Sequence, residues 1–169
     1  TNSSNVAVAD GNAGNVTDGN LSTELWLKSA SGDSIPAEAA VTVDLGEAKA
    51  IGSVYVAQDT ARANGRDILS KGVVEYSLDN NTWYTLGALA EENEQTILGG
   101  ATARYVRVRN TEQKNVWWRL SEIQVFSAED SPLSMAVSLI DLRVGNHNSI
   151  NDASKNNKPE YIVDGDMTT

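Results

Sequence analysis

A tight turn near the start of the chain carries oxygen atoms that could hold a hard cation. The segment Thr17-Asp18-Gly19-Asn20 places one carboxylate beside a glycine and an asparagine. A cation such as calcium takes six to eight oxygens at about 2.3–2.6 Å, and a tight Asp-Gly-Asx turn supplies several by curling its carbonyls inward. Asp18 is therefore a candidate metal ligand, although an isolated Asp-Gly pair is more often only a turn.

Other reactive chemistry is poorly represented in the sequence. The chain has no cysteine, which excludes disulfides, thiolate nucleophiles and cysteine-ligated zinc or iron sites. The single histidine, His147, lies late in the chain, so the first 128 residues cannot form a Ser-His-Asp triad or a multi-histidine metal site. A glycosidase needs only two carboxylates, but no spacing pairs them here, and we expect no catalytic residues.

The charge balance argues against a nucleic-acid partner. The 169 residues include 13 Lys and Arg against 23 Asp and Glu, which gives a net charge of −10 at pH 7 and a pI near 4.4. Such a chain repels a phosphate backbone. No segment approaches the ~18 consecutive apolar residues of a membrane span, and the acidic loops lack the apolar and basic groups that insert into membranes. We expect neither nucleic acid nor membrane insertion.

Short β-branched segments separated by Gly, Asn and Asp predict an all-β domain, either a sandwich or a barrel. In one of them Val106 and Val108 point to one side while Arg107 and Arg109 point to the other, so one face of this strand is solvated. The expected strands span residues 41–46, 51–57, 73–78, 83–86, 103–108 and 120–126.

Two connections between these segments carry a local signal. Residues 77–83 place Asp-Asn-Asn between two strand-like segments, and because Asn tolerates positive φ they predict a tight hairpin. Residues 88–94 are short and acidic, and they are the best helical candidate.

The composition changes after Phe126, which divides the chain into two parts. We predict one domain over residues 1–128, followed by a linker and the truncated start of a second, similar module over residues 129–169. An apolar strand-like segment spans residues 135–144. Residues 163–169 then echo residues 17–23, with Asp-Gly-Asx and Thr at matching positions.

Four motifs follow one another along the first part: residues 15–26, 43–46, 74–83, and the closing pair 104–109 and 117–123. Together they resemble the discoidin, or coagulation factor type C, superfamily, and within it the family 32 carbohydrate-binding modules of secreted bacterial glycoside hydrolases. The resemblance covers about residues 5–127. It implies a discoidin-like antiparallel β-sandwich with jelly-roll-like topology, a structural calcium ion, and a shallow sugar site on the loops at one end.

The resemblance also implies the ligands of the calcium ion. Asp18 and Glu122 would provide carboxylates, and Thr23 would provide its hydroxyl. The ion would thereby tie the first and last strands of the domain together. Main-chain carbonyls would come from Asn15, Asn20, Thr23 and Ser121.

A shallow sugar site needs an aromatic ring against the C–H face of a pyranose, with rigid polar groups around its hydroxyls. Strand alternation turns one of Trp117 and Trp118 inward with Leu120, and we expect Trp117 to be the exposed ring, with Trp26 as a second candidate. Two polar loops would add hydrogen-bonding groups: Gln58, Asp59, Arg62, Asn64, Arg66 and Asp67 in one, and Arg109, Asn110 and Asn115 in the other.

The function that the resemblance implies is non-catalytic glycan binding. The module, with its neighbours, would tether a covalently linked glycoside hydrolase to mucin, N-glycans or glycosaminoglycans, outside or on the surface of a bacterium. Related sugar sites often carry a histidine where this chain has Gln58 and Asp59, so N-acetylglucosamine-containing termini are favoured slightly over galactose-containing ones. The alternative is an adhesion domain that binds proteins or cell surfaces without sugar specificity.

Overall fold

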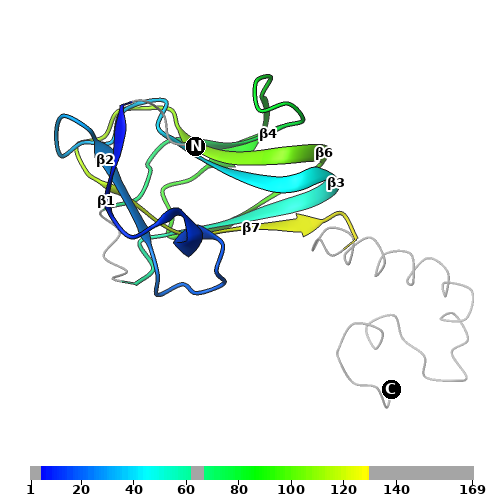
Figure 1. Cartoon of the computed structure of the whole chain (residues 1–169), viewed down its shortest axis with the longest axis horizontal. Helices are drawn as coiled ribbons and strands as arrows, with labels where there is room; N and C mark the ends of the chain where they lie inside the picture. Colours follow the sequence, from blue (N-terminus) through cyan, green and yellow to red (C-terminus); the bar gives the residue numbers. More distant parts are fainter. Residues whose placement is uncertain (1–4, 62–66, 130–169) are drawn as a thin grey trace, which may run out of the picture. The chain divides into compact units, whose positions relative to one another are not determined.

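The computed structural model describes residues 5–61 and 67–129, which form an almost purely antiparallel β-sheet structure (Figure 1). One short 3-10 helix, η1 (Ala13–Val16), precedes the second strand. The strands are β1 (Val6–Asp10), β2 (Leu25–Ser29), β3 (Ala40–Gln58), β4 (Gly72–Ser77), β5 (Tyr84–Leu89), β6 (Glu94–Asn110) and β7 (Trp118–Ser127). They hydrogen-bond in the order β1-β2-β7-β3-β6-β4-β5.

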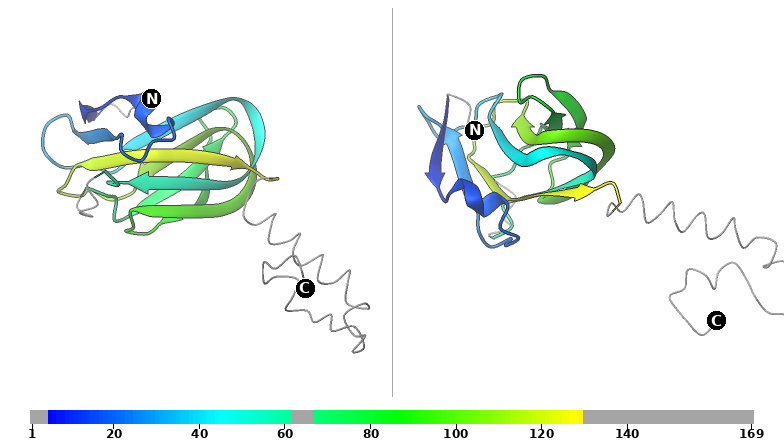
Figure 2. Two further views of the ribbon diagram at one scale, coloured as in Figure 1. Left: turned by 90° about the horizontal axis from the view of Figure 1, so that it is seen from below. Right: turned by 45° about the vertical axis from the view of Figure 1, so that its right-hand side comes forward.

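Two long strands turn this sheet into a sandwich. β3 has 19 residues and β6 has 17, and their pairing shifts register where β3 bulges after Asp44 and again after Ile51. β4 pairs with the later part of β6, whereas β7 pairs with the later part of β3. The long strands therefore pass through both layers, as the further views in Figure 2 show. The predicted discoidin-like antiparallel β-sandwich is confirmed.

The core follows the predicted alternation. Val106 and Val108 of β6 are fully buried, while Arg107 and Arg109 lie on the other face, where both donate to the Glu75 carboxylate. Trp118 and Leu120 of β7 are also completely buried. Alternate residues of a strand share one face of the sheet, so the burial of these apolar side chains determines which faces of β6 and β7 turn toward the core.

The predicted hairpin joins β4 to β5. Asn80 adopts a φ of 59°, and the Asp79 carboxylate accepts the amides of Thr82 and Asn81 at 2.7 and 2.9 Å. These hydrogen bonds lower the pKa of Asp79 to about 2. The turn is thus held by the Asx geometry that its sequence favours.

Two expectations about the elements need correction, and two strands were missed. The helix predicted over residues 88–94 is wrong: these residues end β5 and begin β6, and the Gln95 side chain closes the turn through the N–H and carbonyl of Ala90. The strands expected over residues 41–46 and 51–57 are one bulged strand, β3. β1 and β2 were not predicted from the sequence.

The C-terminal part of the chain lies almost entirely outside the described residues. This applies to the predicted linker and second module, residues 129–169, apart from Glu129, and to the strand-like segment 135–144. In the described ranges, no helix has the length and apolar character needed to cross a membrane.

A core substitution tests the buried face of β7. Leu120→Ala should lower the free energy of unfolding by about 2–5 kcal/mol, because it removes buried apolar surface and leaves a cavity. Leu98→Ala is the matched control, since Leu98 is 49% exposed. Urea denaturation measures both variants, and equal losses would contradict the predicted inward face of β7.

Candidate functional site

The outer face of β2 and β7 gathers aromatic and charged side chains. β2 pairs with β7 so that Trp26 lies opposite Arg119 and Leu27 lies opposite Trp118. Leu27 and Trp118 are buried in the core, so strand alternation turns Trp26 and Arg119 to the outer face. The pairing of these two strands therefore builds the site.

The two adjacent tryptophans point to opposite sides of β7. Trp118 is fully buried, and its indole N–H donates to Gln58 Oε1 at 2.9 Å. Trp117 is half-buried on the outer face and packs edge-on against Trp26, with the ring centroids 5.8 Å apart and the planes inclined at 63°. The exposed aromatic feature is thus a pair of indoles rather than a single ring.

A buried ion network lies beneath Trp26. Arg119, only 1% exposed, pairs through Nη2 with Glu24 Oε2 and through Nη1 with Asp59 Oδ1. Its guanidinium carbon also lies 4.4 Å from the centroid of the Trp26 ring, and the Trp26 indole N–H donates to Glu24 Oε2 at 3.2 Å. Trp26 is therefore held in place by both a cation–π contact and a hydrogen bond.

A polar pocket of ≈ 400 Å³ opens beside this network. In one wall of the pocket the Gly11 backbone packs directly against the Glu24 carbonyl, and a side chain at position 11 would collide with that carbonyl. Gly11 also has a φ of +75°, which favours glycine. The pocket thus combines one indole, charged groups and small hydroxyl-bearing side chains, a set that can contact both the apolar face and the hydroxyls of a sugar. Its lining residues are Asp10, Gly11, Asn15, Ser22, Thr23, Glu24, Trp26, Ala61 and Arg119.

The turn at Asp18 adjoins this pocket through Thr23. The Thr23 hydroxyl donates to the Asp18 carboxylate at 2.8 Å and lies 2.8 Å from the Asn20 carbonyl. From β7, the Glu122 carboxylate reaches the same turn and accepts the Gly19 amide at 3.0 Å. Two carboxylates, a hydroxyl and a carbonyl therefore converge from the two ends of the domain.

The electrostatics of this turn fit a hard cation. Burial raises the pKa of the Glu122 carboxyl, and the nearby Asp18 charge raises it further, although the amides of Gly19 and Asn20 oppose the shift. A divalent cation would compensate both negative charges. In the described ranges no three His, Cys, Asp or Glu side chains converge as a metal cluster, so main-chain carbonyls would have to complete the coordination.

The sequence matches the family model of the F5/8 type C domain over residues 1–123. This chain belongs to the F5/8 type C domain family. No curated protein matches it significantly.

Solved structures share the fold of this F5/8 type C domain. The module CBM32-1 of a family 31 glycoside hydrolase from Clostridium perfringens is 15% identical, with a TM-score of 0.57, over 73% of this chain and 95% of that one. The family 32 module of NanJ from C. perfringens, in complex with galactose, is 17% identical (TM-score 0.55; 71% and 90%). The CBM32 of AlyQ, in complex with 4,5-unsaturated mannuronic acid, is 24% identical (TM-score 0.53; 72% and 92%).

Several residues predicted to contact ligand are instead structural in this F5/8 type C domain. Gln58 and Asp59 are fully buried: Gln58 accepts from Leu69 N and from Trp118, and Asp59 binds Arg119. Asn110 is 1% exposed and donates to the carbonyls of Pro36 and Glu112. We therefore revise their role from ligand contact to support of the loops.

The other predicted ligand residues are dispersed. Arg109 binds Glu75 and Glu38 on the outer face of a different part of the sheet. Asn115 is exposed, and Asp67 is half-buried with its carbonyl accepting the Arg119 amide at 2.8 Å. Arg62, Asn64 and Arg66 lie outside the described residues.

The sequence analysis missed Glu24, Arg119 and Asp10 as pocket residues. The available signal was alternation: Glu24, just before β2, is two residues from Trp26, and Trp117, just before β7, is two residues from Arg119, so each pair should face the same side. Alternation could not show that β2 pairs with β7, and this pairing is what brings these residues together.

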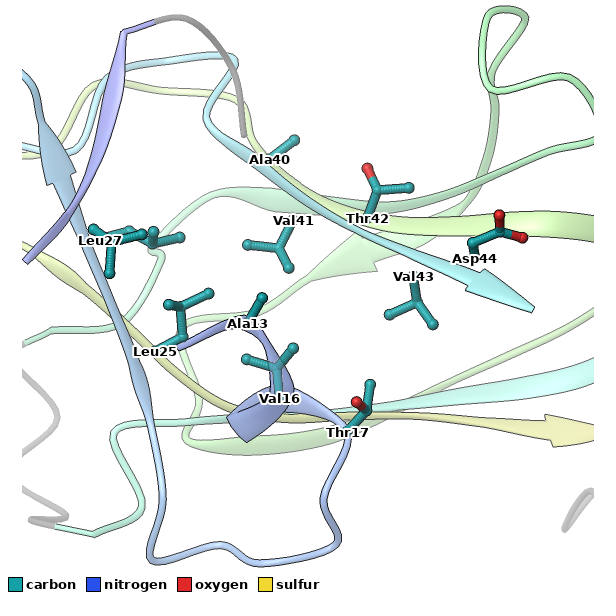
Figure 3. A pocket seen from close by; sticks show the side chains of 11 residues that line it. Ala13, Val16, Thr17, Leu25, Leu27, Ala40, Val41, Thr42, Val43 and Asp44 are labelled. Atoms are coloured by element: carbon teal, nitrogen blue, oxygen red, sulfur yellow. The ribbon is translucent and has the colours of Figure 1, made fainter. Parts of the chain in front are cut away.

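A second hollow of ≈ 350 Å³ has a different character (Figure 3). Val41 and Val43 of β3 face Val16 of η1 and Leu25 and Leu27 of β2 across it, so its wall is largely aliphatic. It lacks the aromatic ring and the converging charges of the polar pocket.

Breaking the buried ion network should be costly. Arg119→Met should lower the free energy of unfolding by roughly 3–5 kcal/mol, because Glu24 and Asp59 lose the charge that compensates them. Urea denaturation measures this loss. Arg104→Met, which removes an exposed pair with Asp44, should change stability little; equal effects would show that burial of Arg119 is unimportant.

Proposed function

We propose that this F5/8 type C domain is a non-catalytic carbohydrate-binding module that tethers a linked glycoside hydrolase to glycans. The glycans would contain N-acetylglucosamine or galactose and belong to a mucin, an N-glycan or a glycosaminoglycan. The supporting observation is the polar pocket with the half-buried Trp26 ring in its wall. A bacterial secreted or cell-surface location fits this role.

The contact energies suit a reversible module. An indole that covers about 60 Å² of a sugar face contributes roughly 1.5 kcal/mol at ~25 cal/mol/Å². Hydrogen bonds to exposed polar groups of the pocket lining, such as Asp10 and Ser22, would add to this. The sum corresponds to a dissociation constant in the ~micromolar to millimolar range, and neighbouring modules would raise avidity on a dense glycan surface.

The solved relatives support the ligand class. The NanJ module was determined with galactose, the CBM32 of AlyQ with 4,5-unsaturated mannuronic acid, and chitosan-binding module 2 of a chitosanase/glucanase from Paenibacillus sp. IK-5 with chitotriose. A binding role also agrees with the pocket chemistry, because the carboxylates of Glu24 and Asp59 are both bound to Arg119. This pairing positions the loops rather than preparing an acid and a base for proton transfer.

We further propose that the turn at Asp18 binds a structural calcium ion. Its ligands would be the carboxylates of Asp18 and Glu122, the hydroxyl of Thr23 and carbonyls of the same segments. The bound ion would supply positive charge where two carboxylates meet. The carbonyl ligands would be those of Asn15, Asn20, Thr23 and Ser121.

Removing the Trp26 ring tests the sugar site. Trp26→Ala should weaken glycan binding at least about tenfold, because the stacking surface is lost. A mammalian glycan array followed by isothermal titration with galactose and N-acetylglucosamine measures the effect. Trp83→Ala is the matched control, since Trp83 is a half-buried indole packed on Arg107 elsewhere. A wild-type array that stays blank, or unchanged binding by Trp26→Ala, would refute the proposal.

Calcium removal tests the cation site. At a free calcium concentration a hundredfold above its dissociation constant, binding should stabilise the domain by about 2.7 kcal/mol. EDTA should therefore lower the melting temperature, and Asp18→Ala should abolish this response, whereas Glu47→Gln, which alters an exposed carboxylate outside the turn, should retain it. A wild-type melting curve that EDTA leaves unmoved would exclude the site.

The same proposal predicts a pH dependence of the calcium-free domain. Because folding raises the pKa of Glu122, the folded state binds more protons than the unfolded state, and stability should fall as the pH rises from the unfolded to the folded pKa. Saturating calcium should remove this fall, since the ion favours the ionised carboxylate.

A further inference from the structure

Three interactions tie Trp26, Glu24 and Arg119 into one unit, which we call the inner trio. The Trp26 indole N–H donates to the Glu24 carboxylate at 3.2 Å, and the Arg119 guanidinium lies over the ring at 4.4 Å. Arg119 also pairs with Glu24. An aromatic ring, a cation and a carboxylate are thus each bound to the other two.

Trp117, Asp33 and Lys28 repeat this arrangement, and we call them the outer trio. The Trp117 indole N–H donates to Asp33 Oδ1 at 3.3 Å, and Lys28 Nζ lies 5.2 Å from the ring centroid. Lys28 also pairs with Asp33 at 3.3 Å. The same three kinds of group make the same three contacts a second time.

The two trios lie side by side. The ring centroids of Trp26 and Trp117 are 5.8 Å apart, and the planes are inclined at 63°. Both tryptophans are half-buried, and Trp26 lines the polar pocket. A ligand in the pocket therefore needs little further length to reach Trp117.

We propose that the two trios form two adjoining sugar subsites, so that the glycan is recognised as at least a disaccharide. The inference rests on the sugar-binding function proposed above and defines its ligand more closely. Each subsite offers an aromatic ring for the C–H face of one pyranose and accessible polar groups for its hydroxyls: Asp10 and Ser22 of the pocket lining beside Trp26, and Lys28 and Asp33 beside Trp117.

The two subsites differ in rigidity. Arg119 and Glu24 of the inner trio are 1% and 7% exposed, whereas the Lys28 and Asp33 side chains are 32% and 80% exposed. Buried, mutually paired groups keep one arrangement, while exposed ion pairs exchange easily with water and ligand. The inner subsite therefore selects one sugar, and the outer subsite accepts the next unit with less discrimination.

The inclination of the rings selects the linkage. Coplanar aromatic rings suit a flat β-1,4-linked ribbon, in which successive sugars present parallel faces. Two rings at 63° present faces in different directions. The disaccharide that fits both has a linkage that turns the second ring relative to the first.

Titrations with four defined sugars test this inference. The probes are galactose, N-acetylglucosamine, lacto-N-biose, which has a turned β-1,3 linkage, and N-acetyllactosamine, which has a straight β-1,4 linkage. Lacto-N-biose should bind at least about tenfold tighter than either monosaccharide, because a second ring is stacked. It should also bind tighter than N-acetyllactosamine.

The indole N–H signals in a ¹H–¹⁵N NMR spectrum give a direct readout, because the chain has four tryptophans. The monosaccharide that binds should shift the Trp26 signal, and lacto-N-biose should shift those of Trp26 and Trp117. Trp83, and Trp118 in the core, should stay unshifted as internal controls.

Two variants separate the subsites. Trp117→Ala should keep the monosaccharide affinity and lose the gain from the second ring, whereas Trp26→Ala should lose both. Asp33→Ala should reproduce the Trp117→Ala pattern more weakly, and Trp83→Ala should resemble the wild type. Monosaccharide binding with no gain from lacto-N-biose, or an equal loss for both ligands in Trp117→Ala, would overturn the two-subsite inference alone. Failure of all four probes to bind the wild type would overturn the proposed function itself.

Discussion

The buried ion pairs of Arg119 hold together the part of the domain on which both candidate sites depend. The guanidinium joins Glu24, just before β2, to Asp59, just after β3, while Arg119 itself belongs to β7. Removing three charged groups from water is costly unless their partners are well placed. The segments that carry these groups are therefore constrained to one arrangement, and Trp26 is packed directly on the guanidinium.

The polar pocket and the proposed calcium site share a wall. Asn15 and Thr23 line the pocket, and the Thr23 hydroxyl also contacts the Asp18 carboxylate. On the other side, the Thr60 hydroxyl donates to the Leu21 carbonyl at 2.6 Å, so the segment after β3 is attached to the same turn. A cation bound at Asp18 would therefore stabilise one wall of the pocket.

Polar residues at strand ends were the least reliable part of the sequence interpretation. Gln58 and Asn110 were expected to face a ligand, but both are buried, and their amides satisfy buried N–H and carbonyl groups of neighbouring loops. A buried amide and a ligand-binding amide have the same sequence signature. Only the tertiary structure shows whether a buried backbone N–H or carbonyl needs that side chain as its hydrogen-bond partner.

The sequence alone determined what depends on local geometry. Period-two alternation identified the buried faces of β6 and β7, the Asp-Asn-Asn segment predicted the hairpin, and the adjacent tryptophans had to point in opposite directions. The tertiary structure decided what depends on strand pairing: it brought β2 beside β7, and so placed Glu24 against Arg119, 95 residues away in the chain. Alternation specifies which side a residue faces, but the choice of neighbouring strand results from long-range core packing. The paired trios of Trp26 and Trp117 follow from that choice.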